Sequence, residues 1–488
     1  MNNTNHFIIE NGVLIKYIGD DDNVTIPSGV TKIGNYAFSN WPSCRDDEML
    51  ASLDDWTLKD NPRITSVQIS DSVTHIGDHA FSGCTNLINI QIPDSVTHIG
   101  QGAFSDCTKL TNLQIPNSIT HIGEFAFSRC IEIISVVIPD GITSLSGTFS
   151  GCTGLTSIHL PDSITRIGSW AFSGCTGLTS ICMPDSVTSI DIWAFHDCSG
   201  LTSIKIPDSV TNIGDSAFYG CNGLASIEIP SNVSFIGTGA FTQTHNLKSI
   251  TVSPKNKTYH STNNCLIETK SKTLIMACQN CIIPDDGSVM KIGKRSFEQC
   301  ATLTNLHIPY GITSIESWAF SYCAELTSIE LPDSITSIGY AAFENCTGLT
   351  SLQIPDSVES IDLRAFSNCT GLTSLQLPNS ITSIAGICSG CTGLANLQLP
   401  NSITNIGSWT FSGCTGLASI NIPNSVTHIG KWAFENCIGL KNLQIPGGVT
   451  QIDNEAFSRC GNLTIYAPSG SSAEEYAKKN DIPFEAAD

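Results

Sequence analysis

Charged residues are scarce in this sequence, and basic residues are the scarcest. Charged side chains make up 14% of the 488 residues, with 23 Lys and Arg against 44 Asp and Glu, so the formal net charge is −21. A chain of this sign is repelled by phosphate backbones and by anionic membrane surfaces. We therefore predict that nucleic acid is not a partner.

Long apolar runs are also missing. No stretch approaches the roughly 18 consecutive apolar residues that indicate a membrane helix, so we predict no membrane insertion. The start, MNNTNHFIIENG, has neither the basic nor the apolar segment of a signal peptide. This start favours a cytoplasmic protein or one from which a leader was removed.

Catalytic motifs are a third absence. The sequence holds no nucleophile paired with a base, no phosphate loop and no dinucleotide fingerprint. The thiol pair Cys278-x-x-Cys281, near Cys265 and His260, lacks the second pair that a zinc site of this type needs. We therefore predict no catalytic residue, no metal site and no cofactor.

What the sequence does contain is a repeat of 23 residues, L-x-x-I-x-I-P-D-S-V-T-x-I-G-x-x-A-F-x-x-C-T-G, over most of its length. Within each block the prolines that close the apolar run recur every 23 residues, with two steps of 22. They are Pro93, Pro116, Pro139, Pro161, Pro184, Pro207, Pro230, Pro309, Pro332, Pro355, Pro378, Pro400, Pro423 and Pro446. Such a period indicates a solenoid, in which each unit buries its apolar face against its neighbours.

Each repeat reads as a strand followed by a return arm. Leu155, Ile158 and Leu160 alternate with Ser157 and His159, the period expected of a strand with one buried face. Stacked strands of this kind form a parallel sheet, and proline ends each one because it cannot donate to the ladder. The Asp-Ser or Asn-Ser pair that follows is expected to turn the chain and satisfy local backbone donors.

The return arm carries two further columns. Sixteen of the 20 phenylalanines occupy its A-F position and predict a continuous aromatic row, with Cys388 in place of one ring. Fifteen of the 21 cysteines share another position, and we interpret them as small buried apolar residues. Parallel side chains in register have the wrong Cβ directions for disulfides, and the odd total fits a reduced setting.

These residues, above all IPDSVTSIGxxAFxxCTGLTSI, resemble the BspA-like leucine-rich repeat proteins of the Treponema-type subclass. The resemblance implies a right-handed curved solenoid of 23-residue units, with a parallel sheet on the concave face, little helix, an N-terminal hairpin cap and a C-terminal helix-strand cap. The expected organisation is a cap (1–26), a first block (27–241) with an acidic insertion at about 40–63, a hairpin-containing interruption (242–284), a second block (285–462) and a terminal cap (463–488).

The resemblance also implies a non-enzymatic adhesion solenoid, displayed at a microbial cell surface or secreted, that binds a host or microbial protein or glycan. The start of the chain and the many thiols leave a second hypothesis open, an intracellular or delivered scaffold or effector that binds a regulatory protein. A third hypothesis, a carbohydrate-active enzyme, has Glu228 with Lys205 and His159 as its candidate cluster. The sequence does not predict an oligomeric state.

Two surfaces are candidate binding sites. The outward position of the strands is polar and almost uncharged, and we expect ligand contacts at His159, Lys205, Glu228, Gln353, Gln376 and Gln398. Stacked Gln and Ser side chains there could instead hydrogen-bond along their own ladders. The second surface is an aromatic platform of Trp170 with Trp193 and Trp409 with Trp432, whose alternative role is packing on the outer wall.

Overall fold

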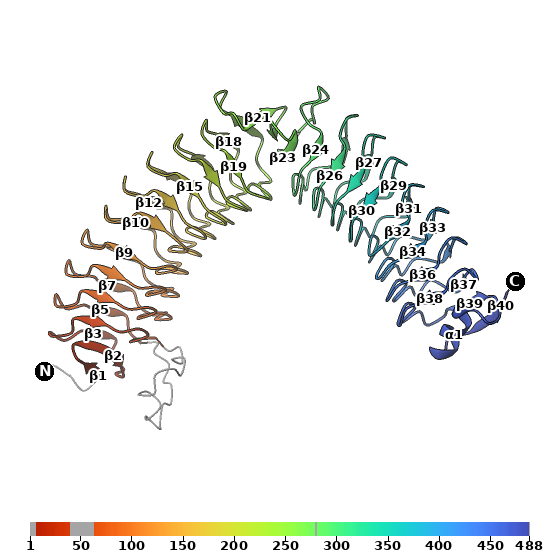
Figure 1. Ribbon diagram of the computed structural model, residues 1–488. Helices are drawn as coiled ribbons and strands as arrows, with labels where there is room; N and C mark the ends of the chain where they lie inside the picture. The colour runs from red at the N-terminus through yellow and green to blue at the C-terminus, as the bar shows by residue number, and fades with distance from the viewer. Residues whose placement is uncertain (1–5, 40–62, 279–280, 488) are drawn as a thin grey trace. The chain divides into compact units, whose positions relative to one another are not determined.

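The computed structural model describes residues 6–39, 63–278 and 281–487. The acidic insertion predicted at about 40–63 lies, apart from its last residue, outside the described residues. The chain divides into two compact units, Met1–Lys257 (unit 1) and Thr258–Asp488 (unit 2). Within each unit the turns of the chain stack on one another (Figure 1).

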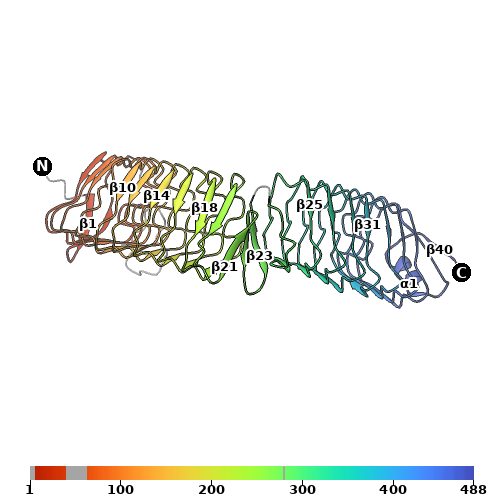
Figure 2. The same cartoon turned by 90° about the horizontal axis from the view of Figure 1, so that it is seen from above.

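Most turns carry a long strand and a short strand, each paired in parallel with its equivalent in a neighbouring turn. In β10 and β12, for example, Ser135 pairs with Ser157 and Val137 with His159. In the turn of Gln114 the long strand is reduced to one bridge, between Asn89 and Asn112. The short strands pair in the same way as the long ones, as in β13 and β15, where Ile167 lies opposite Ile190. Figure 2 shows β10, β14 and β18 following one another along unit 1. The structure thus confirms a solenoid of stacked parallel strands.

Unit 1 begins with an antiparallel hairpin, β1 (Phe7–Glu10) and β2 (Val13–Tyr17), which turns through Asn11 and Gly12 at φ 49° and 78°. Its long strands are β3 (Asn23–Thr25), β5 (Ser66–Gln68), β7 (Asn89–Gln91), β10 (Ser135–Val137), β12 (Ser157–His159), β14 (Ser180–Cys182), β16 (Ser203–Lys205), β18 (Ser226–Ile229) and β20 (Ser249–Val252). Its short strands are β4 (Lys32–Ile33), β6 (His75–Ile76), β8 (His98–Ile99), β9 (His121–Ile122), β11 (Ser144–Leu145), β13 (Arg166–Ile167), β15 (Ser189–Ile190), β17 (Asn212–Ile213) and β19 (Phe235–Ile236).

Unit 2 begins with three antiparallel strands, β21 (Tyr259–Thr262), β22 (Cys265–Glu268) and β23 (Thr273–Ala277). Its long strands are β25 (Asn305–His307), β27 (Ser328–Glu330), β29 (Ser351–Gln353), β31 (Ser374–Gln376), β33 (Asn396–Gln398), β35 (Ser419–Asn421), β37 (Asn442–Gln444) and β39 (Thr464–Ala467). Its short strands are β24 (Lys291–Ile292), β26 (Ser314–Ile315), β28 (Ser337–Ile338), β30 (Ser360–Ile361), β32 (Ser383–Ile384), β34 (Asn405–Ile406), β36 (His428–Ile429) and β38 (Gln451–Ile452). The unit ends with helix α1 (Ser472–Lys479), capped by the Ser471 side chain, and β40 (Phe484–Ala486), which pairs with β39.

Phenylalanine rings form the core of each unit. Phe81, Phe104 and Phe127 stack with ring centroids 5.2 and 5.3 Å apart and their planes within 3° of parallel. All three side chains are fully buried. Stacked rings at this spacing bury large apolar areas and fix the distance between turns. The predicted aromatic row is therefore present, and the buried thiol of Cys388 occupies its place between Phe366 and Phe411.

The serine and threonine of the repeat connect successive turns. The Ser209 hydroxyl donates to the Val187 carbonyl at 2.6 Å, and the Thr211 hydroxyl donates to the Thr188 carbonyl at 3.2 Å. The serine hydroxyl can also accept from a backbone donor, as Ser334 does from the Gly311 N–H at 2.9 Å while it donates to the Ile312 carbonyl. Hydrogen bonds of this kind satisfy backbone groups that a turn would otherwise leave unpaired.

Candidate functional site

The outward position of the long strands forms one continuous set of exposed side chains in each unit, which we call the strand column. In unit 1 it comprises Gln68, Gln91, Gln114, Val137, His159, Cys182, Lys205, Glu228 and Thr251, and in unit 2 His307, Glu330, Gln353, Gln376, Gln398, Asn421 and Gln444. All of these residues are exposed. Because the pleat sends alternate side chains to opposite faces, the hydrophobic residues between them lie in the core.

Gln353, Gln376 and Gln398 lie opposite one another in register on β29, β31 and β33. Within the described part of the chain, no hydrogen bond joins the side-chain amides of these three residues to any other group. Ladder bonds are found instead in the neighbouring Ser/Asn position, where the Ser419 hydroxyl donates to the Asn396 side-chain oxygen at 2.8 Å. Each amide retains a donor and an acceptor that face outward.

The three unit 1 candidates, His159, Lys205 and Glu228, lie on β12, β16 and β18 and are exposed. Among the described residues, no hydrogen bond or ion pair links their side chains. The cluster contains one carboxylate, whereas most glycoside hydrolysis uses two on opposite sides of the scissile bond. Their placement does not bring an acid and a base together.

The tryptophan pairs do come together. The rings of Trp170 and Trp193 are 4.3 Å apart between centroids, and those of Trp409 and Trp432 are 5.0 Å apart. Trp193 is 37% exposed and Trp409 is 46% exposed, so each pair leaves an indole accessible. The Lys431 ammonium lies 3.6 Å from the Trp432 ring centroid, a cation–π contact that covers part of that ring.

The four tryptophans share an unusual backbone conformation that the sequence pattern did not reveal. Their φ angles lie between 55° and 61°, in the left-handed region. The next turn after Trp193 has Ser216 at φ 52°, and a turn of unit 2 has Ala341 at φ 52°. The turn geometry of the repeat thus imposes this conformation whatever the side chain, at a cost of about 1–2 kcal/mol for a residue other than glycine.

Fourteen of the fifteen cysteines of the shared column are buried as free thiols, and Cys300 is partly exposed. Burial raises the pKa of Cys84, Cys152 and Cys346 to about 12, so these thiols are neutral at ordinary pH. This agrees with their interpretation as small core residues. Cys182, in the strand column, is the one free cysteine exposed among the described residues.

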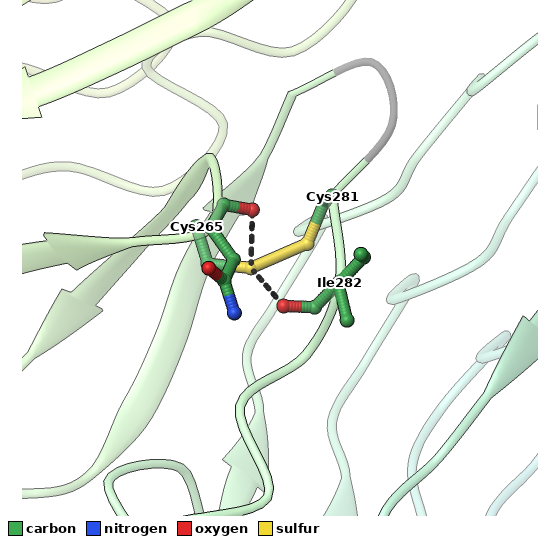
Figure 3. The surroundings of a disulfide bond; sticks show 4 residues. Cys265, Cys281 and Ile282 are labelled. Carbon is green, nitrogen blue, oxygen red and sulfur yellow. Dashed lines mark hydrogen bonds between the residues drawn. A yellow bond between two sulfur atoms is a disulfide. The ribbon is translucent and has the colours of Figure 1, made fainter.

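One cysteine pair departs from the expected reduced setting. Cys265 and Cys281 form a disulfide with their Cα atoms 5.9 Å apart (Figure 3). Cys278 remains a free buried thiol. The Cys265 sulfur also lies 3.5 Å from the Ile282 carbonyl oxygen. A disulfide sulfur has no hydrogen to donate, so this contact can be a hydrogen bond only in the reduced form. Two of the three cysteines considered for a zinc site, Cys265 and Cys281, are therefore joined in the disulfide.

Within residues 6–39, 63–278 and 281–487, no group of three or more His, Cys, Asp or Glu side chains could hold a metal ion. His75, His98 and His121 stack with centroids 4.5 and 5.8 Å apart. The same ranges contain no helix with the length and apolar character that crossing a bilayer requires.

Stacked parallel strands ended by prolines, an aromatic row in the core and little helix define a leucine-rich-repeat solenoid. The chain belongs to the family with BspA-type leucine-rich repeats. The family model described as "BspA type Leucine rich repeat region (6 copies)" matches residues 19–55, 51–148, 145–268, 275–388 and 385–477. Solenoids of this family are generally non-catalytic binding scaffolds.

Solved structures of bacterial repeat proteins are similar to this chain. A leucine-rich repeat protein from Bacteroides ovatus is 25% identical, with 98% of this chain and 94% of that chain covered and a TM-score of 0.49. A leucine rich cell surface protein from Faecalibacterium prausnitzii is 27% identical, with 99% and 96% covered and a TM-score of 0.36. A leucine-rich repeat protein from Eubacterium ventriosum is 23% identical, with 90% and 91% covered and a TM-score of 0.43. No protein of curated function matches the chain.

Proposed function

We propose that this protein is a non-enzymatic adhesion solenoid that recognises a protein or glycan partner at a microbial cell surface. The observation that carries the proposal is the strand column, in which in-register amides such as Gln353 and Gln376 face outward without partners among the described residues. A surface of neutral donors and acceptors suits the hydroxyls of glycans and the backbone of extended peptides. The exposed faces of Trp193 and Trp409 add apolar contact area of the kind that dominates binding hot spots.

The disulfide supports the location in this proposal. Disulfides persist mainly in oxidising compartments, whereas the cytosol keeps thiols reduced. The bond between Cys265 and Cys281 therefore favours a position outside the cytoplasm. The buried free thiols do not oppose this, since a thiol with a pKa raised by burial reacts slowly with oxidants.

Binding is tested with the whole chain on immobilised host matrix proteins and on glycans. We expect Gln353→Ala combined with Gln376→Ala and Gln398→Ala to lower binding, and Trp170→Ala combined with Trp193→Ala to lower it also. The matched control is Thr382→Ala, at an exposed position outside the strand column. Unchanged binding by both combinations, with each variant folded, would remove these residues from the proposed site.

Location is tested by treating intact source cells with protease and following the chain against a cytosolic marker. The proposal expects the chain to be shaved while the marker survives. If the chain survives until the cells are lysed, the second candidate replaces the first. That candidate is an intracellular or delivered scaffold that binds a regulatory protein, and the many free thiols are the observation in its favour.

A further inference from the structure

Unit 1 has a surface hollow of about 250 Å³ on the side of the short strands, away from the strand column. Side chains from four successive turns line it. Phe125 and Trp170 supply its aromatic walls, and Glu124, Arg166 and Asp191 supply its charged groups. Three serine hydroxyls complete the lining. Trp170 thus belongs both to the tryptophan pair and to this hollow.

The hollow exists because one turn lacks a side chain at the position that Trp170 occupies in its own turn. Gly147 lies there at φ 60°, and a Cβ atom on it would be 2.5 Å from Cδ1 of Phe125. The Phe125 ring, one turn before, therefore lies over Gly147. Trp170 holds the same position one turn after Gly147. Phe125 and Trp170 therefore lie on either side of a turn that has no side chain at this position.

The charged groups are arranged for recognition of a neutral polar ligand. The Arg166 Nε group donates to Oδ2 of Asp191, whose side chain is 9% exposed. The ion pair compensates the negative charge of the buried Asp191 carboxylate. The Arg166 side chain is itself 60% exposed, and no other partner for it is found in the described residues. Its remaining N–H groups can therefore donate to a ligand, and the exposed Glu124 carboxylate can accept.

We propose that this hollow binds a single neutral pyranose ring, as one unit of a glycan. Its volume lies below the 300–1,000 Å³ that is usual for drug-sized ligands, and one sugar ring is a ligand of suitable size. The C–H face of a pyranose stacks on an indole, while its hydroxyls pair with guanidinium, carboxylate and serine groups. The Glu124 carboxylate, for which no partner is found in the described part of unit 1, disfavours anionic sugars. This proposal rests on the proposed function and specifies its glycan ligand.

The test is titration of the whole chain with neutral methyl pyranosides, monitored by ligand-observed NMR. We expect saturable binding that Trp170→Ala weakens by about tenfold or more, which corresponds to about 1.4 kcal/mol. The variant is expected to fold because the chain already has alanine at this backbone conformation, at Ala341. Trp318→Ala, the same change at the equivalent position of a turn in unit 2 (φ 56°), is the control and should leave binding of the monosaccharide unchanged.

Two further variants test the polar side of the hollow. Glu124→Gln keeps a hydrogen-bonding group and should change the affinity for a neutral sugar by less than about threefold. Gly147→Leu would overlap the Phe125 ring and displace it from the wall of the hollow, and it should lower binding. Binding confined to a cationic amino sugar and lost in Glu124→Gln would overturn the assignment to neutral sugars.

Absence of saturable binding by any neutral pyranoside, or binding that Trp170→Ala leaves unchanged, would overturn the proposal. If the whole chain still binds glycans or matrix proteins in that case, the proposed function stands and only the hollow is misassigned. If it binds none of them and is not at the cell surface, the proposed function fails as well.

Discussion

The Cys198 thiol donates a hydrogen bond to the carbonyl oxygen of Phe172, 3.0 Å away in the preceding turn. The same relationship recurs from turn to turn, as between Cys221 and Phe195 at 3.1 Å. The cysteine column and the phenylalanine row are therefore linked by hydrogen bonds between successive turns. Such a thiol fills core space and also connects its turn to the preceding turn.

The thiol column is predicted to be chemically inert in the folded protein. Burial raises the pKa of Cys84 and Cys152 to about 12, and the thiolate is the reactive form. Alkylation near pH 8, followed by peptide mapping, should modify the exposed Cys182 and leave the buried column cysteines unmodified until denaturant is added. Rapid native labelling of Cys198 or Cys221 would contradict the packing described here.

The aromatic row should dominate the stability of its own turns. Phe195 is fully buried and stacks on Phe172 and Phe218 with centroids 5.4 and 5.3 Å apart. We expect Phe195→Ala to cost about 3–5 kcal/mol in the free energy of unfolding of the turns around it. Phe235→Ala is the control, because that ring is 51% exposed and outside the row. Chemical denaturation monitored by circular dichroism measures the free energy of unfolding of both variants. Similar losses in the two would disprove the special contribution of the aromatic row.

The glycine of the C-T-G segment is predicted to be required for close stacking. A Cβ atom on Gly177 would lie 2.6 Å from the carbonyl oxygen of Thr153 in the preceding turn. We expect Gly177→Ala to destabilise the protein by about 1–3 kcal/mol through this overlap. Gly461→Ala is the matched control, since a Cβ atom there meets nothing within 4 Å. Equal melting temperatures for the two variants would show that the turns can separate at little cost.

The histidine stack predicts sensitivity to mild acid. Burial, and then the charges of His75 and His121, lower the pKa of His98 below the usual histidine value of about 6.5. As the pH falls through about 6.5, the unfolded chain binds the proton before the folded chain does, so this group makes folding less favourable. The effect is absent at higher pH, where the imidazole is neutral in both states.

The measurement is the melting temperature at about pH 7.5 and pH 5 for the wild type and for His98→Gln. Carboxylates contribute to the pH dependence of both proteins, so the difference between the two isolates the histidine. We expect the wild type to lose more stability than the variant over this interval. A larger fall in melting temperature for His98→Gln than for the wild type would show that the pKa of His98 is not lowered in the folded state.

Much of the fold could be predicted from the sequence because the period constrains every turn at once. The strands, the hairpin at Asn11 and Gly12 and the helix capped by Ser471 follow from local patterns that the stacking does not override. The hollow beside Trp170 could not be predicted, because Glu124 and Asp191 are brought together only by the stacking of turns and by the missing side chain at Gly147. The shortened repeat there is the signal that could have drawn attention to it.

The disulfide was missed for a related reason. Cys265 and Cys281 are outside the 23-residue period, and their approach depends on how the chain returns after β23. Spacing in the sequence alone does not distinguish this pair from one that includes Cys278. The general argument that cysteines of one column cannot pair remained valid, but it does not apply to residues outside the column.

The disulfide leads to a prediction that can be checked without any ligand. The bond closes a loop with a sequence separation of 16 residues, and constraining a loop of this length stabilises the folded state by about 3 kcal/mol in the chain-entropy account. Peptide mapping without reductant should recover Cys265 joined to Cys281. Reduction, or Cys281→Ser, should then speed amide exchange in β22 and β23 while β33 and β35 stay protected, because each turn of a solenoid depends mainly on its neighbours.

Cys278→Ser is the control that leaves the bond intact. Recovery of all three cysteines as free thiols from protein purified without reductant would disprove the bond and remove its support for a location outside the cytoplasm.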